Sequence, residues 1–331
     1  MKTRNLSRLI RAYRSLKADV RKQRLFLRDT LMQDVALARQ NNDGSLDEED
    51  FTKILRYYGF GVPAIVGEGI CTLRGKAMSR RERLGISYQG ALTGLYDDFF
   101  DKTNLPPDRI REMMHRPGHF NPDSSLEKLF IHFLRRVHEN VPDKAYFSES
   151  FNKVFDAQLE SKSQKSQSLR AGDIIDITFK KGGLSLLFYR SVFPGRAGAA
   201  EEEALYHTGG LMQLGNDIFD VYRDSREDIQ TLPTTCRNIA EVREVYTGKS
   251  ARAIAAIRAS GFQSRHIEKF LEKFLLGMSR CPVCLDRLAS LESRSGNTFK
   301  PLEYERADLV CDMEKPANIL RSVRHFLRLD Y

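Results

Sequence analysis

The sequence contains no apolar segment that could cross a membrane. Its longest nearly apolar stretch, Gly183 to Tyr189, is far shorter than the roughly 20 residues that a bilayer-spanning helix requires. The N-terminus lacks the uninterrupted apolar segment of a secretory signal, and the five cysteines are too few and odd in number to indicate a disulfide framework. We therefore expect a cytoplasmic protein in a reducing compartment. An Arg-rich organelle transit peptide is the alternative interpretation of the N-terminus.

Acidic residues are almost missing from positions 1–28. Ten of the chain's 53 basic residues lie in this segment, but only one of its 44 acidic residues does. Residues 29–331 therefore contain 43 residues of each sign. The whole net charge of +9 therefore belongs to the first 28 residues. A body without net charge disfavours a nucleic-acid-binding surface, and we expect no nucleic-acid partner.

Apolar residues recur mostly at helical spacing, and long alternating strand patterns are hard to find. The sequence therefore predicts an all-α fold, with a basic amphipathic leader helix over residues 1–28 and one large helical domain over residues 29–331. The leader carries an apolar stripe of Leu6, Ile10, Tyr13, Leu16 and Val20. Breaks are expected at 41–44, 59–63 and 104–107, and a helix carries residues 87–102. Further helices are expected at 108–115, 124–139, 143–167, 172–193, 200–225, 228–246, 249–260, 264–290 and 313–328.

Two metal-like patterns in the sequence are weak. Residues 41–46 resemble the middle of a Ca²⁺ loop, but Arg39 stands where the first carboxylate ligand belongs, so we interpret them as a turn. Cys281 and Cys284 have metal-ligand spacing, and Cys311 could add a third thiolate, but no second pair or nearby histidine accompanies them. Buried helical cysteines are the favoured interpretation, and a metal role stays open.

The first acidic constellation is Asp97, Asp98 and Asp101, near the end of a predicted helix. Offsets of three and four residues place these carboxylates on one helical face. Three carboxylates within one turn are unfavourable unless cations share them, and hard oxygen ligands suit Mg²⁺. The alternative is a solvated acidic helix end.

The second constellation is Asn216, Asp217, Asp220 and Asp224, after a glycine pair at positions 209 and 210. Asn216, Asp220 and Asp224 follow each other at intervals of four residues, which predicts one stripe on an otherwise apolar helix. Ionised groups there are unfavourable unless they face a metal or water. The glycines would let another helix or a ligand approach closely.

A third element is the segment 178–183, in which Gly182 and Gly183 interrupt a helical pattern beside Lys180 and Lys181. A helix kinked at the glycines would offer freed backbone groups and a lysine to an anion. Arg170 lies 46 residues before Asn216. A solvated basic patch is the alternative interpretation of these cations.

Together the two acidic motifs resemble those of the class I isoprenoid synthases, meaning terpene cyclases and trans-prenyltransferases. Residues 97–101 resemble the first aspartate-rich motif of that family. Residues 216–224 are similar to its second metal motif, with aspartate in place of the usual serine or threonine and of the final glutamate. The resemblance covers about residues 85–245. It implies a helical bundle of the isoprenoid synthase type with a central active-site cavity.

The resemblance also implies an activity and its residues. It implies an enzyme that uses about three Mg²⁺ ions to ionise an allylic prenyl diphosphate, releasing pyrophosphate and forming a terpenoid. The implied metal ligands are Asp97, Asp98, Asp101, Asn216, Asp217, Asp220 and Asp224. The implied diphosphate-binding residues are Arg170, Lys180, Lys181 and Arg223, of which Arg170, Lys181 and Arg223 are the catalytic candidates.

Some positions depart from the elongating branch of the family. Lys102 and Thr103 follow the first motif where elongating prenyltransferases have paired arginines, so ionisation of one substrate is favoured over condensation of two. Condensation by a trans-prenyltransferase, of the elongating or of the head-to-head squalene or phytoene synthase type, is the alternative. The second alternative is a non-catalytic helical protein that docks on membranes or proteins through residues 1–28. Residues 1–28 either make peripheral contact with an anionic membrane or pack on the helical bundle, and a homodimer is a further expectation.

Overall fold

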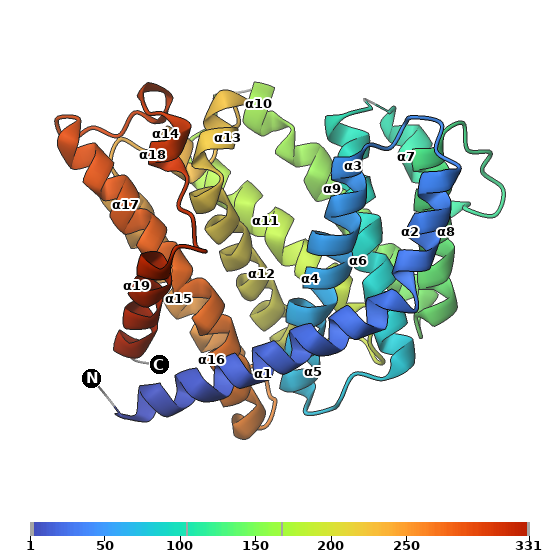
Figure 1. Ribbon diagram of the computed structural model, residues 1–331, viewed down its shortest axis with the longest axis horizontal. Helices are drawn as coiled ribbons and strands as arrows, with labels where there is room; N and C mark the ends of the chain where they lie inside the picture. The colour runs from blue at the N-terminus through green and yellow to red at the C-terminus, as the bar shows by residue number, and fades with distance from the viewer. Residues whose placement is uncertain (1–2, 104, 167, 330–331) are drawn as a thin grey trace. The chain divides into compact units, whose positions relative to one another are not determined.

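The computed structural model describes residues 3–103, 105–166 and 168–329 (Figure 1). No strand occurs in these ranges, which confirms the predicted all-α class. None of the helices in them is both long enough and apolar enough to cross a bilayer. The chain divides into two compact units. The leader helix predicted over residues 1–28 is present as α1, Thr3–Arg28, while the grouping of residues 29–331 into one domain with a central cavity stays a prediction.

The first unit combines residues 1–14, 152–187 and 197–331. Its core is built from apolar side chains of α11, α12, α15 and α17, among them Ile174, Leu211, Val242 and Leu288, each fully buried. The unit takes in the start of α1 and parts of α9 (Lys144–Ser161) and α11 (Ala171–Arg190). Its other helices are α10 (Ser163–Ser166), α12 (Ala199–Phe219), α13 (Val221–Arg226), α14 (Leu232–Thr235), α15 (Ile239–Arg258), α16 (Ser264–Met278), α17 (Arg280–Arg294), η3 (Pro301–Glu303), α18 (Arg306–Leu309) and α19 (Pro316–Arg328).

The second unit combines residues 15–151 and 188–196. Aromatic rings fill its core: Phe99 packs edge-on against Phe130 with ring centroids 4.9 Å apart, and Tyr96 lies 5.5 Å from Phe151. Its helices are α2 (Leu31–Gln40), α3 (Glu48–Thr52), η1 (Lys53–Tyr58), α4 (Gly59–Gly61), η2 (Val62–Gly67), α5 (Glu68–Arg74), α6 (Arg80–Asp101), α7 (Pro107–His115) and α8 (Ser125–Asn140), together with the rest of α1.

The break predicted at residues 59–63 is wrong. The chain stays helical from Glu48 to Arg74, with two π-helical segments, η1 and η2, on either side of α4. Pro63 lies inside this continuous helix, in the first turn of the π-helical segment η2, and cannot donate a backbone hydrogen bond to the preceding turn. Gly90 of α6 lies against the backbone of Tyr58, so the irregular helix packs closely on α6.

Other predicted helices differ from the observed ones in their boundaries, among them the helix expected over 143–167, which is divided into α9 and α10. The helix expected over 264–290 is divided at Ser279 into α16 and α17. The expected break at 247–248 is absent, because α15 runs through Gly248, around which there is open space. The helix α15 begins only at Ile239, because the preceding residue, Asn238, caps it: the Asn238 side chain accepts a hydrogen bond from the Glu241 N–H. Capping by Asn238 therefore sets the start of α15, which apolar spacing alone had placed too early, at residue 228.

Candidate functional site

The first acidic motif lies in the last turns of α6, in the second unit. The helix begins at a capping box, in which Ser79 and Glu82 accept each other's backbone N–H groups. Asp97 accepts a hydrogen bond from the Tyr58 hydroxyl at 2.9 Å. The charge of Asp97, together with burial, raises the pKa of Tyr58 well above its ordinary value. Tyr58 therefore stays protonated and keeps donating to Asp97.

Asp98 is the buried carboxylate of this motif, at 3% exposed. Its Oδ1 lies 3.2 Å from Lys53 Nζ and 3.9 Å from Lys102 Nζ. Its Oδ2 is buried without a hydrogen-bond partner in the part of the chain that the structure describes. Burial and the charge of Asp50 raise the pKa of Asp98 to about 6, against the pull of the two lysines. One oxygen of the motif is thus left to take a proton or a cation.

Two lysines supply counter-charge to the first motif. Lys102 Nζ lies 3.1 Å from Asp47 Oδ2 and also contacts Asp50. Lys53 reaches Asp98 from η1, which lies 45 residues earlier in the chain. Spacing along α6 gives no signal for Lys53 or Asp50, and sequence reasoning missed both.

The second motif lies on two helices of the first unit, so the prediction of one helix over 200–225 is wrong at Asp220. The helix α12 ends at Phe219, and Asp220, with φ −92° and ψ 10°, joins it to α13. The backbone N–H of Asp220 still bonds to Asn216 and that of Asp224 to Asp220, both at 2.9 Å. The four-residue spacing therefore survives the junction. The two buried acids, however, are Asp217 and Asp224.

Asp217 has a complete set of hydrogen bonds. Its Oδ2 accepts from the Thr178 hydroxyl at 2.9 Å, and its Oδ1 accepts from the Gln213 amide at 2.9 Å. Burial raises the pKa of Asp217 to about 6, although both donors and the charge of Lys181 oppose the shift. This residue ties α12 to α11 in the described structure. Of Arg170, Lys180 and Lys181, it is Lys181 whose charge acts on Asp217.

Arg223 lies between the remaining two acids of the motif. Its Nη2 is 2.7 Å from Asp220 Oδ2 and 3.6 Å from Asp224 Oδ1, while Asn216 donates to Asp220 at 3.0 Å. Asp224 is 4% exposed, and its contact with Arg223 is an ion pair longer than a hydrogen bond. Burial and the charge of Asp217 raise the pKa of Asp224 to about 7. The guanidinium of Arg223 therefore contacts the carboxylates of Asp220 and Asp224, to which the sequence analysis assigns a metal ion.

The glycine pairs of α11 and α12 form a helix crossing. A Cβ on Gly182 would collide with the backbone of Gly209, and one on Gly210 would collide with the ring of Phe179. The helix α11 runs from Ala171 to Arg190 without a break at Gly182 and Gly183, and the predicted kink there stays a prediction. The glycines let the two helices approach closely, one of the two roles expected for the pair on α12.

Arg170 and Lys180 have acidic partners of their own. Arg170 forms a two-pronged ion pair with Asp173, at 2.9 and 3.1 Å, and is largely exposed just before α11. Lys180 pairs with Glu160 at the surface. Neither side chain contacts the second motif in the described structure. Their role toward a diphosphate stays a prediction.

Among the residues that the structure describes, no three Asp, Glu, His or Cys side chains are grouped closely enough to hold a metal ion. The Asp101 side chain lies outside these residues, so the first motif is described only through Asp97 and Asp98. The five cysteines are free and buried. Cys284 donates to the Ile218 carbonyl at 3.3 Å, which fits the expected packing role of this thiol.

The N-terminal half of α1 is held by polar contacts. Asn5 donates to the carbonyls of Leu327 and Leu329, at 3.0 and 2.9 Å, and Arg8 pairs with Glu268 at 3.0 Å. Asn5 and Arg8 are accordingly buried, whereas the start of the apolar stripe is exposed: Leu6, Ile10 and Tyr13 are 42%, 45% and 59% accessible. Helical periodicity predicts the stripe but not which face of the helix the protein covers.

Among the cavities of the first unit, two have volumes of 590 and 560 Å³. No carboxylate of either motif lines them. The larger one is lined by arginines of α17 and α19, which sequence reasoning also missed, although their spacing of three and four residues on α19 is a helical-face signal.

Comparison with protein-family models, with curated proteins and with solved structures found no match. No relative therefore assigns a role to any residue of either motif.

Proposed function

We propose that this chain is an Mg²⁺-dependent enzyme that ionises an allylic prenyl diphosphate, releases pyrophosphate and forms a terpenoid product. One observation carries the proposal. Each acidic motif keeps a buried carboxylate with a raised pKa, Asp98 in the first and Asp224 in the second, and one buried oxygen of Asp98 has no hydrogen-bond partner among the described residues. Burial penalises the charged form of such groups, so they gain more from a divalent cation than solvated carboxylates do.

The donor chemistry fits Mg²⁺, which prefers hard oxygen ligands. Asp98 offers an orphaned buried oxygen, and Asp220 and Asp224 already share one cationic group, Arg223. In the described structure Lys53, Lys102 and Arg223 supply the positive charge that a divalent ion would bring. These three side chains must leave the carboxylates when the ion binds.

When bound, Mg²⁺ would neutralise the charge that grows on the departing diphosphate. The chain's own cations bind that group as well. Arg223 lies at the second motif and would exchange Asp220 for a phosphate oxygen, forming the stronger kind of charge-assisted hydrogen bond. Lys181, with Arg170 and Lys180 earlier on the same segment, would add to the positive field. In the second unit Tyr96 and Phe99, both buried, exclude water from the surroundings of Asp98.

The test is an assay of the purified chain with Mg²⁺ and allylic diphosphates from C10 to C35, with pyrophosphate and hydrocarbon products measured. We expect Mg²⁺-dependent release, lowered by about 100-fold in Asp98→Asn and in Asp224→Asn. The matched controls are the exposed acids Asp108 and Glu244, whose Asp108→Asn and Glu244→Gln variants should retain full activity. No release from any substrate, or full activity in Asp98→Asn, would refute the proposal.

Condensation of two substrates is distinguished in the same assay by adding isopentenyl diphosphate. Chain-elongated products would place the enzyme among the prenyltransferases, while unchanged products support ionisation of one substrate. A homodimer stays a prediction, to be checked by light scattering.

The exposed stripe on α1 favours a second role, peripheral contact with an anionic membrane. Leu6, Ile10 and Tyr13 share one helical face with Lys17 and Arg21, all of them exposed. Apolar side chains beside cations are typical of helices that lie in the membrane interface. If the chain binds vesicles but neither binds nor turns over diphosphates with Mg²⁺, the non-catalytic docking role replaces the enzymatic one.

A further inference from the structure

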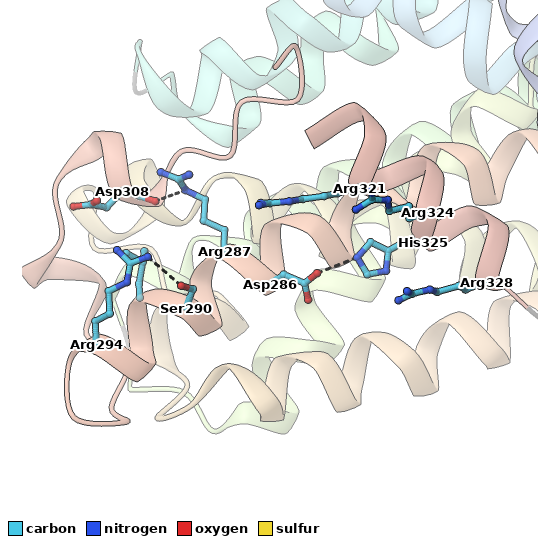
Figure 2. Close-up of a pocket in the computed structure, with 10 residues that line it drawn as sticks. Asp286, Arg287, Ser290, Arg294, Asp308, Arg321, Arg324, His325 and Arg328 are labelled. Carbon is cyan, nitrogen blue, oxygen red and sulfur yellow. Dashed lines mark hydrogen bonds and ion pairs between the residues drawn. The ribbon is translucent and has the colours of Figure 1, made fainter. Parts of the chain in front are cut away.

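The larger cavity of the first unit, of 590 Å³, is lined by arginines from two helices (Figure 2). Arg287 and Arg294 come from α17, and Arg321, Arg324 and Arg328 come from α19. Figure 2 shows the two groups along facing helices. Its acidic lining consists of two aspartates, Asp286 and Asp308. The cavity therefore has an excess of positive charge.

One of the two aspartates is already engaged. Asp286 accepts from Arg243 at 2.8 Å and lies 3.0 Å from the His325 ring nitrogen, so little of its charge is left for the cavity. Arg287 donates to the backbone carbonyls of Ala307 and Asp308 rather than to a carboxylate. Those bonds fix the guanidinium of Arg287 without cancelling its charge.

The three arginines of α19 follow at intervals of three and four residues, which places them on one face of the helix. All three are exposed, and no carboxylate among the described residues pairs with any of them. Arg294 donates to the Ser290 hydroxyl at 3.2 Å, a neutral partner. Five guanidinium groups without a carboxylate partner among the described residues thus line one cavity, more than a single carboxylate ligand would satisfy.

We propose that this cavity binds a phosphate or diphosphate group carried by a small molecule, without a metal ion. Guanidinium groups match phosphate oxygens with paired hydrogen bonds, and several of them together balance more than one negative charge. The volume lies within the range of small-molecule sites, roughly 300–1,000 Å³, and exceeds what a lone phosphate ion fills. The site contains no residue of the two acidic motifs and does not depend on the proposed catalytic function.

The test is isothermal titration calorimetry of the full chain with inorganic pyrophosphate and with inorganic phosphate. EDTA is present, so that a metal-dependent site cannot contribute. We expect saturable pyrophosphate binding that is weakened about tenfold or more in Arg321→Gln/Arg324→Gln, since each lost arginine removes charge-assisted hydrogen bonds. Arg321→Lys/Arg324→Lys keeps the charge but loses the paired geometry and should give an intermediate loss. The exposed Arg237 is the matched control, and Arg237→Gln should bind as the wild type does.

A competition with phosphatidylglycerol vesicles identifies the source of the phosphate group. If the vesicles displace pyrophosphate, and Arg321→Gln/Arg324→Gln loses this displacement, the group belongs to a lipid headgroup. If they do not displace it, the ligand is free in solution. Absence of pyrophosphate binding in EDTA, or equal affinity in Arg321→Gln/Arg324→Gln and the wild type, overturns the proposal. Circular dichroism of each variant verifies folding, which these exposed side chains should not affect.

Discussion

Gly182 of α11 and Gly209 of α12 meet backbone to backbone, and each occupies the space that a Cβ on the other would need. We predict that Gly182→Ala destabilises the protein by about 2 kcal/mol or more, because the added methyl group has no room and must push the helices apart. Thermal and urea unfolding measure the effect.

Gly248 of α15 is the control for this substitution. It also lies within a helix, but a Cβ there would meet nothing within 4 Å. Gly248→Ala should leave stability unchanged or raise it by up to about 1 kcal/mol, as alanine does in exposed helix interiors. Equal stability of Gly182→Ala and the wild type would show that the crossing is looser than described.

A second prediction concerns Mg²⁺ and Asp224. A ligand that binds only the folded state stabilises it, so saturating Mg²⁺ should raise the Tm of the wild type by about 2–4 °C. The rise should vanish in Asp224→Asn, which removes one of the two buried carboxylates of the second motif, and persist in Glu244→Gln. Differential scanning fluorimetry with and without EDTA measures it. An equal rise in wild type and Asp224→Asn would place the ion elsewhere.

A third prediction concerns pH and Asp43. This carboxylate accepts from the backbone N–H groups of Ser45 at 3.0 Å and Ser125 at 2.8 Å. The side-chain hydrogen bond of Ser45, together with these backbone bonds, lowers its pKa to about 2. A pKa below the ordinary value means that the stabilisation is present above pH 4 or so and is lost as the pH falls toward 2. Asp43→Asn should therefore cost about 1 kcal/mol or less at pH 7, given the exposure of the group, and progressively less as the solution is acidified.

Urea unfolding at pH 7 and pH 3 tests the Asp43 prediction. The exposed Asp29 is the control, and Asp29→Asn should behave as the wild type does at both values. A pH-independent effect of Asp43→Asn would mean that the charge of the carboxylate is not what stabilises the turn.

A fourth prediction concerns the exposed stripe of α1. Leu6→Ser/Ile10→Ser should reduce co-sedimentation with phosphatidylglycerol vesicles by about tenfold, because two apolar anchors are lost from the membrane-facing side. Folding should not change, since both side chains are already in water. Leu37→Ser removes an exposed leucine of α2 instead and should retain binding. Undiminished binding of Leu6→Ser/Ile10→Ser would assign the membrane contact to charge alone or to another face.

The sequence predicted much of the helical fold but little of the charge pairing. Apolar periodicity places α7, α8 and α11 close to their observed bounds. It does not reveal the junction at Asp220, where no glycine or proline stands. It also cannot reveal Lys53 beside Asp98, because that pair forms between segments 45 residues apart. Local spacing predicts which residues share a face, whereas tertiary packing decides what that face meets.

The polar anchors of α1 bear on how the chain stays dispersed in solution. Residues 1–28 carry the entire net charge of +9, and what remains has equal numbers of acids and bases. A protein without net charge has little electrostatic repulsion between its copies and is close to its least soluble condition near neutral pH. The charge of this helix, which Asn5 and Arg8 hold in the first unit, gives an otherwise neutral protein the colloidal stability of a basic one. A truncation at residue 28 would thus bring on isoelectric precipitation in low salt.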